Sequence, residues 1–301
     1  MMRLSRFIFA SLCVKKFRAN NRQSMKTTVL ILSCLATLLL NHEARAATVL
    51  FDSPPFDTTW YQSGYLNMSF SDTTGLTVNG STANTITYFT NNRSQFQNLA
   101  VGDSIELTFN LTATNPQASY NGMFFGLMSS NGSQLLENYY GNSTTQATVE
   151  PFSGYLAMLN LGNNPSGYMY IYERKKNSGY YSLYNGNSLG AYAQEQPAAN
   201  LTSGTAYPVS LKVTRTGSLE NTIVMTINNQ TTTLIHTGTD FFAFDSINFG
   251  YQTNGSDSLT FDDIKVSFVP EPGSDMLLLS ALAFFGMFQL SRRSRRKWCQ
   301  E

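Results

Sequence analysis

Histidine, the side chain whose ordinary pKa best suits proton transfer near neutral pH, is nearly absent from this chain. Two of the 301 residues are histidines, and only His236 lies between residues 47 and 268. A Ser-His-Asp triad would therefore depend on His236 alone, and a metal site built from several histidines is excluded. Because His236 lies in the Thr-rich run 231–237, which is typical of a strand at a sheet edge, we interpret it as a structural residue.

Aromatic side chains offer a second chemistry, the binding of sugar rings by flat apolar faces. Tyr168, Tyr170 and Tyr172 alternate with Met169 and Ile171, so in a strand the three phenol rings share one face and form a candidate glycan platform. The alternative is that the three tyrosines pack in the core while Met169 and Ile171 face solvent. Further aromatic candidates for glycan contact are Trp60, Tyr61, Tyr180, Tyr181 and Tyr184.

Aspartates gather towards the end of the same region, and carboxylate oxygens at irregular loop spacing suit calcium. They are Asp240, Asp245, Asp257, Asp262 and Asp263. No Asp-x-Asp-x-Asp loop is present, and aspartate is also common in turns that hold no metal. We therefore expect no cofactor, with structural calcium as the alternative.

Strands must position these side chains, because apolar residues recur at every second position. Ile105, Leu107, Phe109 and Leu111 alternate with polar residues, which predicts a half-buried strand. The same period recurs in 209–213, 223–227 and 247–251, and strands are predicted over 120–129 and 155–161. Roughly a dozen such segments, with no helical stripe between them, predict an all-β domain over 47–268, an antiparallel β-sandwich or jelly roll.

The last predicted strand contains a change of parity. Leu259 and Phe261 share one parity, whereas Ile264 and Val266 share the other, and the change falls at the pair 262–263. A β-bulge at this pair would return all four side chains to the inward face. We therefore predict a bulged final strand.

The pattern is similar to the concanavalin A-like (laminin G-like) lectin and glucanase sandwiches. The segments that carry the resemblance are Val101-Gly102-Asp103 before a long strand, the strand 123–128, the hairpin 211–228 and the closing run 259–264. Glucanases of this type carry a Glu-x-Asp-x-x-Glu run, and none occurs here. The glutamates are solitary in sequence: Glu106, Glu137, Glu150, Glu173, Glu195 and Glu220. We expect a protein that is not an enzyme; the alternatives are a glycan-active hydrolase of this sandwich type and a purely structural membrane-anchored module.

Three parts follow one another at the C-terminus, in 269–297. The first is Val269-Pro270-Glu271-Pro272, where proline predicts an extended, protease-accessible hinge. An apolar segment over 274–291 follows, a marginal transmembrane helix whose mainly apolar run 276–290, fifteen residues long, rises about 22 Å. The third part is the basic cluster Arg292, Arg293, Arg295, Arg296 and Lys297, which should keep the C-terminus in the cytoplasm.

This tail resembles the PEP-CTERM protein-sorting signal of Gram-negative bacteria, over about a tenth of the chain. The resemblance implies recognition by exosortase, a membrane protease-transpeptidase, and a protein associated with the cell surface or with exopolysaccharide. The protein would be held in the inner membrane before processing and would then reach the surface or the extracellular matrix. The alternative is an ordinary C-terminal membrane anchor that follows a Pro-rich linker.

A secretory signal peptide is predicted over 1–46. The apolar core 29–40 is followed by Ala44-Arg45-Ala46, with cleavage after Ala46. Residues 1–24 hold six of the twenty Lys and Arg, and they are an extension or a misassigned start. A partial lipobox ending at Cys34 is the alternative to this cleavage site.

Charge and cysteine agree with export. Between Ala47 and Pro270 there are fifteen Asp and Glu against seven Lys and Arg, a net charge of about −8, which disfavours nucleic acid as a partner. The three cysteines, Cys13, Cys34 and Cys299, all lie outside this region, so the domain uses no disulfide. We therefore predict a non-catalytic exported protein that is sorted through its tail and has polysaccharide as a candidate ligand.

Overall fold

The computed structural model describes residues 46–53, 60–63, 67–79, 83–90, 95–114, 122–135, 149–160, 168–176, 189–195, 201–239, 241–252 and 258–271. All of them except Ala46 belong to one compact unit, Ala47–Glu271. Within these ranges no helix is long and apolar enough to cross a membrane. The predicted signal-peptide core, the apolar segment 274–291 and the basic cluster lie outside the described residues.

Two large antiparallel sheets form the domain, which confirms the predicted all-β sandwich. The eight-stranded sheet has the order β14 (Gln230–Thr237), β13 (Glu220–Ile227), β12 (Ala206–Gly217), β7 (Ser104–Thr114), β17 (Ser258–Val269), β4 (Gly75–Asn79) and β3 (Asn67–Ser71), and β1 (Thr48–Ser53) also pairs with β17. The seven-stranded sheet has the order β11 (Leu189–Glu195), β10 (Met169–Arg174), β9 (Ser153–Asn160), β8 (Gly122–Ser129), β16 (Ser246–Gln252), β5 (Ala83–Tyr88) and β2 (Tyr61–Ser63). A small third sheet pairs β6 (Gln97–Asn98) with β15 (Ala243–Phe244).

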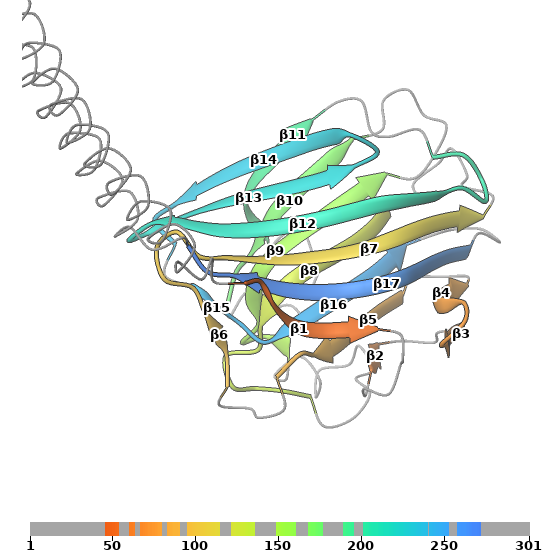
Figure 1. The fold of residues 1–301 in the computed structure, drawn as a ribbon, viewed down its shortest axis with the longest axis horizontal. Coiled ribbons are helices and arrows are strands. Elements are labelled where there is room, and N and C mark those ends of the chain that lie inside the picture. Colours follow the sequence, from red (N-terminus) through yellow and green to blue (C-terminus); the bar gives the residue numbers. More distant parts are fainter. Residues whose placement is uncertain are drawn as a thin grey trace, which may run out of the picture. The chain divides into compact units, whose positions relative to one another are not determined.

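The core lies between the two layers, which Figure 1 shows with β7, β12 and β17 in front of β8, β9 and β16. Phe109 of β7 joins the layers, because its ring centroid lies 5.0 Å from Phe125 and 5.2 Å from Phe249 of the opposite sheet. Both pairs are edge-on, the arrangement that aromatic quadrupoles favour. Burying such a ring stabilises the fold by about 1.5–3 kcal/mol relative to exposing it.

The predicted bulge in the last strand is confirmed. Asp262 pairs with Asn110, whereas the next paired residue, Lys265, is opposite Thr108, so the register shifts between them. Asp263 takes up the extra length with a φ of 51°, in the left-handed region. The apolar residues on both sides of the bulge all face the core, as predicted: Leu259, Phe261, Ile264 and Val266.

Candidate functional site

A row of tyrosines, Tyr168 just before β10 and Tyr170 and Tyr172 in it, is the first candidate site. Met169 and Ile171 are 1% and 0% exposed in the core, so the alternating tyrosines lie on the outer face of the seven-stranded sheet. The ring centroids of Tyr168 and Tyr170 are 5.6 Å apart, and those of Tyr170 and Tyr172 are also 5.6 Å apart, the latter pair stacked with an interplanar angle of 17°. The predicted shared face is confirmed, and the alternative of tyrosines in the core is wrong. We call these three residues the tyrosine strip.

Apolar side chains extend the strip sideways across the sheet. Tyr170 is paired with Met158 of β9, and Met158 is paired in turn with Phe124 of β8. A Cβ atom added at Gly122 would lie within van der Waals distance of the rings and sulfur of these neighbours, 3.4 Å from Phe124 Cε2 and 3.8 Å from Met158 Sδ. Gln194 of β11 is exposed on the other side of Tyr170 and can supply amide hydrogen bonds. Phe124 is only 8% exposed, so the accessible surface is the tyrosine strip with Met158 on one side and Gln194 on the other, which suits stacking on a sugar ring.

Trp60 does not belong to this surface, so its assignment as a glycan contact is wrong. It is 8% exposed and lies in the core, with ring centroids 5.5 Å from Phe70, 6.1 Å from Phe51 and 6.2 Å from Phe249. The indole is buried because its strand neighbourhood brings three other apolar rings around it. Tyr61 instead packs edge-on against Tyr88, with centroids 5.8 Å apart. The remaining candidates, Tyr180, Tyr181 and Tyr184, lie outside the described residues.

His236 takes part in a buried polar network between the two sheets. Its Nδ1 atom lies 2.9 Å from the hydroxyl of Tyr155, and Asn221 donates to the same hydroxyl at 3.0 Å. On the other side, His236 Nε2 lies 3.6 Å from Glu173 Oε2. Glu173 is solitary in sequence but not in space, because β10 and β14 lie next to each other in the sandwich.

The network is inside the protein rather than on a surface open to substrate. Tyr155 is fully buried and His236 is 9% exposed. Burial raises the pKa of Tyr155 to about 12, even though the hydrogen bonds from Asn221 and Thr239 act in the opposite direction. The phenol is therefore neutral at physiological pH and serves as a hydrogen-bonding group between the sheets.

The aspartates that are neighbours in sequence do not converge. Asp245 precedes β16 of the seven-stranded sheet, whereas Asp262 and Asp263 form the bulge in the other sheet. Asp240 and Asp257 lie outside the described residues, and in the described part of the chain no three His, Cys, Asp or Glu side chains gather to hold a metal ion.

Asp245 is instead held by hydroxyl and amide donors. Its carboxylate accepts hydrogen bonds from the backbone N–H of Ser130 at 2.9 Å, from the Ser130 hydroxyl, and from the Ser246 hydroxyl at 3.0 Å. Burial raises the pKa of Asp245, and these hydrogen bonds counteract part of that effect. The residue ties the end of β8 to the start of β16.

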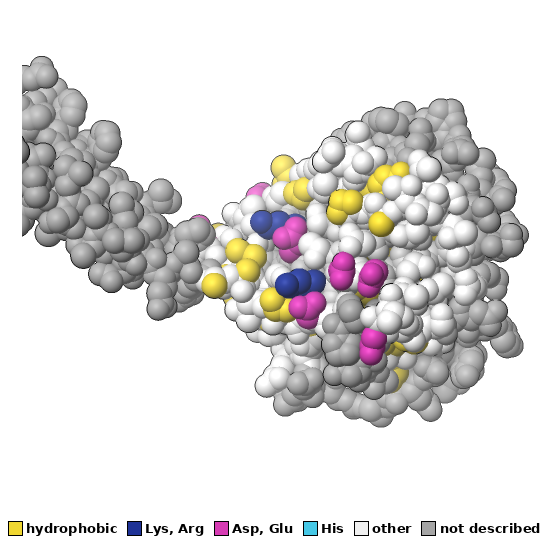
Figure 2. All heavy atoms as spheres, turned by 45° about the vertical axis from the view of Figure 1, so that its right-hand side comes forward, with side chains coloured by type: hydrophobic (Ala, Val, Ile, Leu, Met, Phe, Trp, Pro, Cys, Tyr) yellow, Lys and Arg dark blue, Asp and Glu magenta, His cyan; other side chains and the backbone are white. Residues whose placement is uncertain are grey.

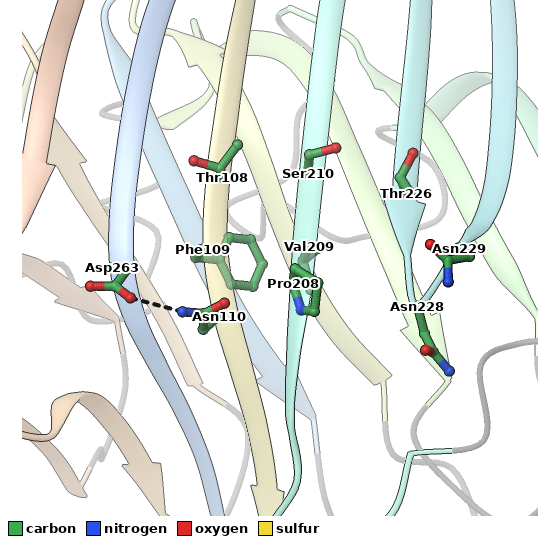
Figure 3. A pocket seen from close by; sticks show the side chains of 10 residues that line it. All are labelled: Thr108, Phe109, Asn110, Pro208, Val209, Ser210, Thr226, Asn228, Asn229 and Asp263. Carbon is green, nitrogen blue, oxygen red and sulfur yellow. Dashed lines mark hydrogen bonds between the residues drawn. The ribbon is translucent and has the colours of Figure 1, made fainter.

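A shallow hollow of about 300 Å³ lies on the outer face of the eight-stranded sheet, next to the bulge. Figure 3 shows its ten lining residues, most of them polar, with Asn110 donating a hydrogen bond of 2.8 Å to Asp263. Asn228 and Asn229 at its rim have positive φ angles of 46° and 63°, as a tight turn requires. The face of the domain that Figure 2 shows carries a small number of charged side chains, and both basic and acidic ones are among them. The hollow presents hydrogen-bonding groups, and the stacking surface lies on the other sheet.

The first residues of the C-terminal motif are part of the folded domain. Val269 is the last residue of β17 and pairs with Ser104, Pro270 is buried, and Glu271 donates its backbone N–H to Asp103 Oδ1 at 2.9 Å. The expectation of an accessible hinge is therefore wrong for Val269, which ends the last strand of the domain, and for Pro270, which is buried. Glu271 is exposed, as expected, but its backbone N–H is bound by a turn of the domain. Pro272 lies outside the described residues.

Several solved structures are similar to this chain at low sequence identity. A legume lectin-like domain from Entamoeba histolytica is 12% identical, with a TM-score of 0.45, and the match covers 73% of this chain and 97% of that one. Lectin UEA-II, complexed with galactose, is 11% identical, with a TM-score of 0.43 and coverage of 75% and 99%. Alginate lyase Aly36B, in complex with an alginate trisaccharide, is 14% identical, with a TM-score of 0.40 and coverage of 74% and 98%.

The C-terminal segment has a match of its own. No curated protein matches the sequence. Residues 268–296 match the PEP-CTERM protein-sorting motif, and this range includes Val269 to Pro272 and four of the five cations of the basic cluster. Such a motif indicates a sorted, exported protein. The chain therefore carries a PEP-CTERM protein-sorting motif that follows an antiparallel β-sandwich domain in the sequence.

Proposed function

We propose that this protein is a non-catalytic, exported protein of the cell surface or exopolysaccharide matrix, processed at its tail by an exosortase-type enzyme and binding polysaccharide through the tyrosine strip. The observation that carries the proposal is the sorting motif at 268–296. An apolar segment and a basic cluster follow the motif in the order that membrane insertion with a cytoplasmic C-terminus requires.

The tyrosine strip supports the polysaccharide part of the proposal. Stacked rings on the outer face of a sheet offer a preformed apolar surface, and tyrosine hydroxyls add hydrogen bonds at its edges. A rigid strand surface also loses little conformational entropy when a ligand binds. An extended glycan, with several similar rings in a row, matches a row of aromatic rings along one strand.

The non-catalytic part of the proposal is supported by the carboxylates of the same sheet. Asp245 is enclosed by Ser130 and Ser246, and Glu173 lies against His236 between the sheets. Glycosidases need two carboxyl groups on opposite sides of a bound sugar. Neither of these two faces the tyrosine strip, since Glu173 has the inward parity of Met169 and Ile171.

Processing is tested first, by measuring the C-terminal mass and the location of the protein in the native host with and without its exosortase. We expect a mature form that lacks residues 276–301 only when the enzyme is present. A mature protein that retains these residues in the intact host would overturn the sorting part of the proposal. Release of reducing sugars from a panel of polysaccharides tests the non-catalytic part, and we expect none.

A further inference from the structure

The carboxylate of Asp103 joins the sorting motif to the domain. Oδ2 accepts a hydrogen bond from the backbone N–H of Ala100 at 2.9 Å, and Oδ1 accepts one from the backbone N–H of Glu271 at 2.9 Å. Asp103 also donates its own N–H to the carbonyl of Ala100 at 3.1 Å, which closes a turn. We call residues 100–103 the motif-binding turn. It precedes β7, and Figure 1 shows the start of β7 beside the end of β17.

Gly102 makes room for the motif. Its φ of +93° suits glycine, and a Cβ atom at this position would overlap the carboxyl group of Glu271. The side chain of the motif's central residue therefore lies directly on the backbone of the turn. Pro270, the residue before it, is buried. Side chain, backbone and the preceding proline all engage the same edge of the domain.

The motif-binding turn is itself held in place by Arg215 of β12. Gly102 donates to the carbonyl of Arg215 at 2.6 Å, and Arg215 donates its N–H to the carbonyl of Asp103 at 3.0 Å. The guanidinium group donates to the carbonyl of Leu99 at 2.9 Å and lies 3.8 Å from the centre of the Phe242 ring. The surface under the motif is thus a supported part of the fold and not a loop that would follow the motif when it moves.

We propose that the motif-binding turn holds Val269–Glu271 on the domain and that the processing enzyme acts only on the fraction of molecules in which the motif has been released. This inference rests on the proposed function, since it assumes an exosortase-type enzyme. Glu271 is exposed, but an enzyme that reads a Pro-Glu-Pro sequence in extended form also needs its backbone, whose N–H is bound to Asp103, and its carboxyl group lies against Gly102. When the competent state is a minor one, the apparent affinity of the enzyme falls in proportion to its population.

The decisive variant is Asp103→Ala, because it weakens the contact and leaves the motif unchanged. A hydrogen bond to a charged group is worth about one to two powers of ten in an equilibrium constant, so we expect processing to be roughly tenfold faster than in the wild type. Asp103→Asn keeps an acceptor for Glu271 but not the charge, so its processing rate should lie between those of the wild type and Asp103→Ala. Asp52→Ala is the matched control: this exposed carboxylate lies on β1, beside Lys265, away from the motif.

Two readouts are needed, both on the full chain. Pulse–chase analysis in the native host measures the rate of tail removal, and hydrogen exchange of the Glu271 amide, on protein purified from a host without the enzyme, measures release directly. Faster processing and faster exchange in Asp103→Ala, with Asp52→Ala unchanged, are the expected results. Processing at the wild-type rate or slower, in a variant whose melting temperature shows it to be folded, would overturn the inference.

The two proposals fail differently. If the wild-type tail is never removed in the intact host, the proposed processing is wrong, while exchange at Glu271 still decides whether the turn holds the motif. If the tail is removed but Glu271 exchanges as fast as an unstructured amide in the wild type, the holding role is wrong and the processing stands. Should Asp103→Ala fail to fold, Asp103→Asn gives the same comparison with a smaller expected change of about threefold.

Discussion

Thr48 pairs with Phe268, so β1 at the beginning of the domain lies against β17 at its end. Ala47 and Val269 are consequently found at the same end of the eight-stranded sheet. The predicted signal-peptide cleavage site after Ala46 and the sorting motif therefore adjoin neighbouring strands, although more than 200 residues separate them in the sequence. Any enzyme that processes either end works next to a folded edge.

The tyrosine strip is tested by the double variant Tyr170→Ala/Tyr172→Ala. If the strip binds glycan, removal of two stacked rings should weaken binding at least about tenfold, as loss of central aromatic anchors does in other interfaces. Binding is measured on a glycan array and then by titration of the best ligand. Tyr207→Ala, on β12 of the other sheet, is the control and should bind as the wild type does. Unchanged binding in the double variant, with folding retained, would remove the strip as a site.

Tyr155→Phe tests the buried network. It removes a buried hydroxyl that is hydrogen-bonded to Asn221 and His236, while Asn221 keeps the carbonyl of Phe241 and His236 keeps Glu173. Loss of these two buried hydrogen bonds costs about 1–3 kcal/mol of unfolding free energy. Chemical denaturation at pH 7 measures the loss. His236→Phe removes the imidazole together with its contacts and is the second variant. Thr237→Ala, at an exposed position, is the control. If Tyr155→Phe and His236→Phe destabilise the protein no more than Thr237→Ala does, the network has no structural role.

The same tyrosine predicts a pH dependence at the alkaline end. An unfolded tyrosine titrates near 10, and the folded one near 12, because burial favours the neutral phenol. Its contribution to stability is therefore complete below pH 10 and is lost as the pH rises through 12. This contribution is on the order of 3 kcal/mol. Unfolding free energies of wild type and Tyr155→Phe, measured between pH 9 and 12, should converge as the pH rises.

Asp245→Asn predicts a pH dependence at the acidic end. Burial raises the pKa of Asp245 in the folded protein above the unfolded value of 3.8. The neutral carboxyl group therefore contributes fully to folding stability below pH 3.8, and this contribution is lost as the pH rises through the folded pKa. The amide keeps the shape and does not ionise. We therefore expect the stability of the variant relative to wild type to improve as the pH is raised from about 4 towards neutrality. Melting temperatures in a pH series measure this, and a difference between variant and wild type that does not change with pH would contradict the prediction.

Deletion of Asp263 tests the bulge. A strand without the extra residue gives Leu259, Phe261, Ile264 and Val266 the same parity, so all four can still face the core without a bulge. We therefore expect the deletion variant to fold, with a circular dichroism spectrum like that of the wild type. Asp263→Asn is the control, since asparagine accepts a positive φ and should change the stability by less than about 1 kcal/mol. A deletion variant that is largely unfolded would contradict the assignment of Asp263 as the extra residue.

The strands and their buried faces could be read from the sequence because a two-residue period is a local property. The alternation around Phe109 predicted which side of β7 is buried, and the change of parity at Asp262 predicted the bulge. The order of motif, apolar segment and basic cluster was likewise sufficient to identify the sorting signal. None of these features depends on which strands pair.

What only the tertiary structure decided are contacts between residues distant in the sequence. Packing of the two sheets against each other places Glu173 next to His236 and surrounds Trp60 with rings from both sheets. The assignment of strands to sheets separates Asp245 from the bulge aspartates. Asp103 and Glu271 are 168 residues apart in the sequence. They are in contact because β7 and β17 pair, with Ser104 opposite Val269. Local periodicity determines the faces of strands, but neighbours across a sheet follow from the packing of the whole chain, and the environment of each polar group follows from those neighbours.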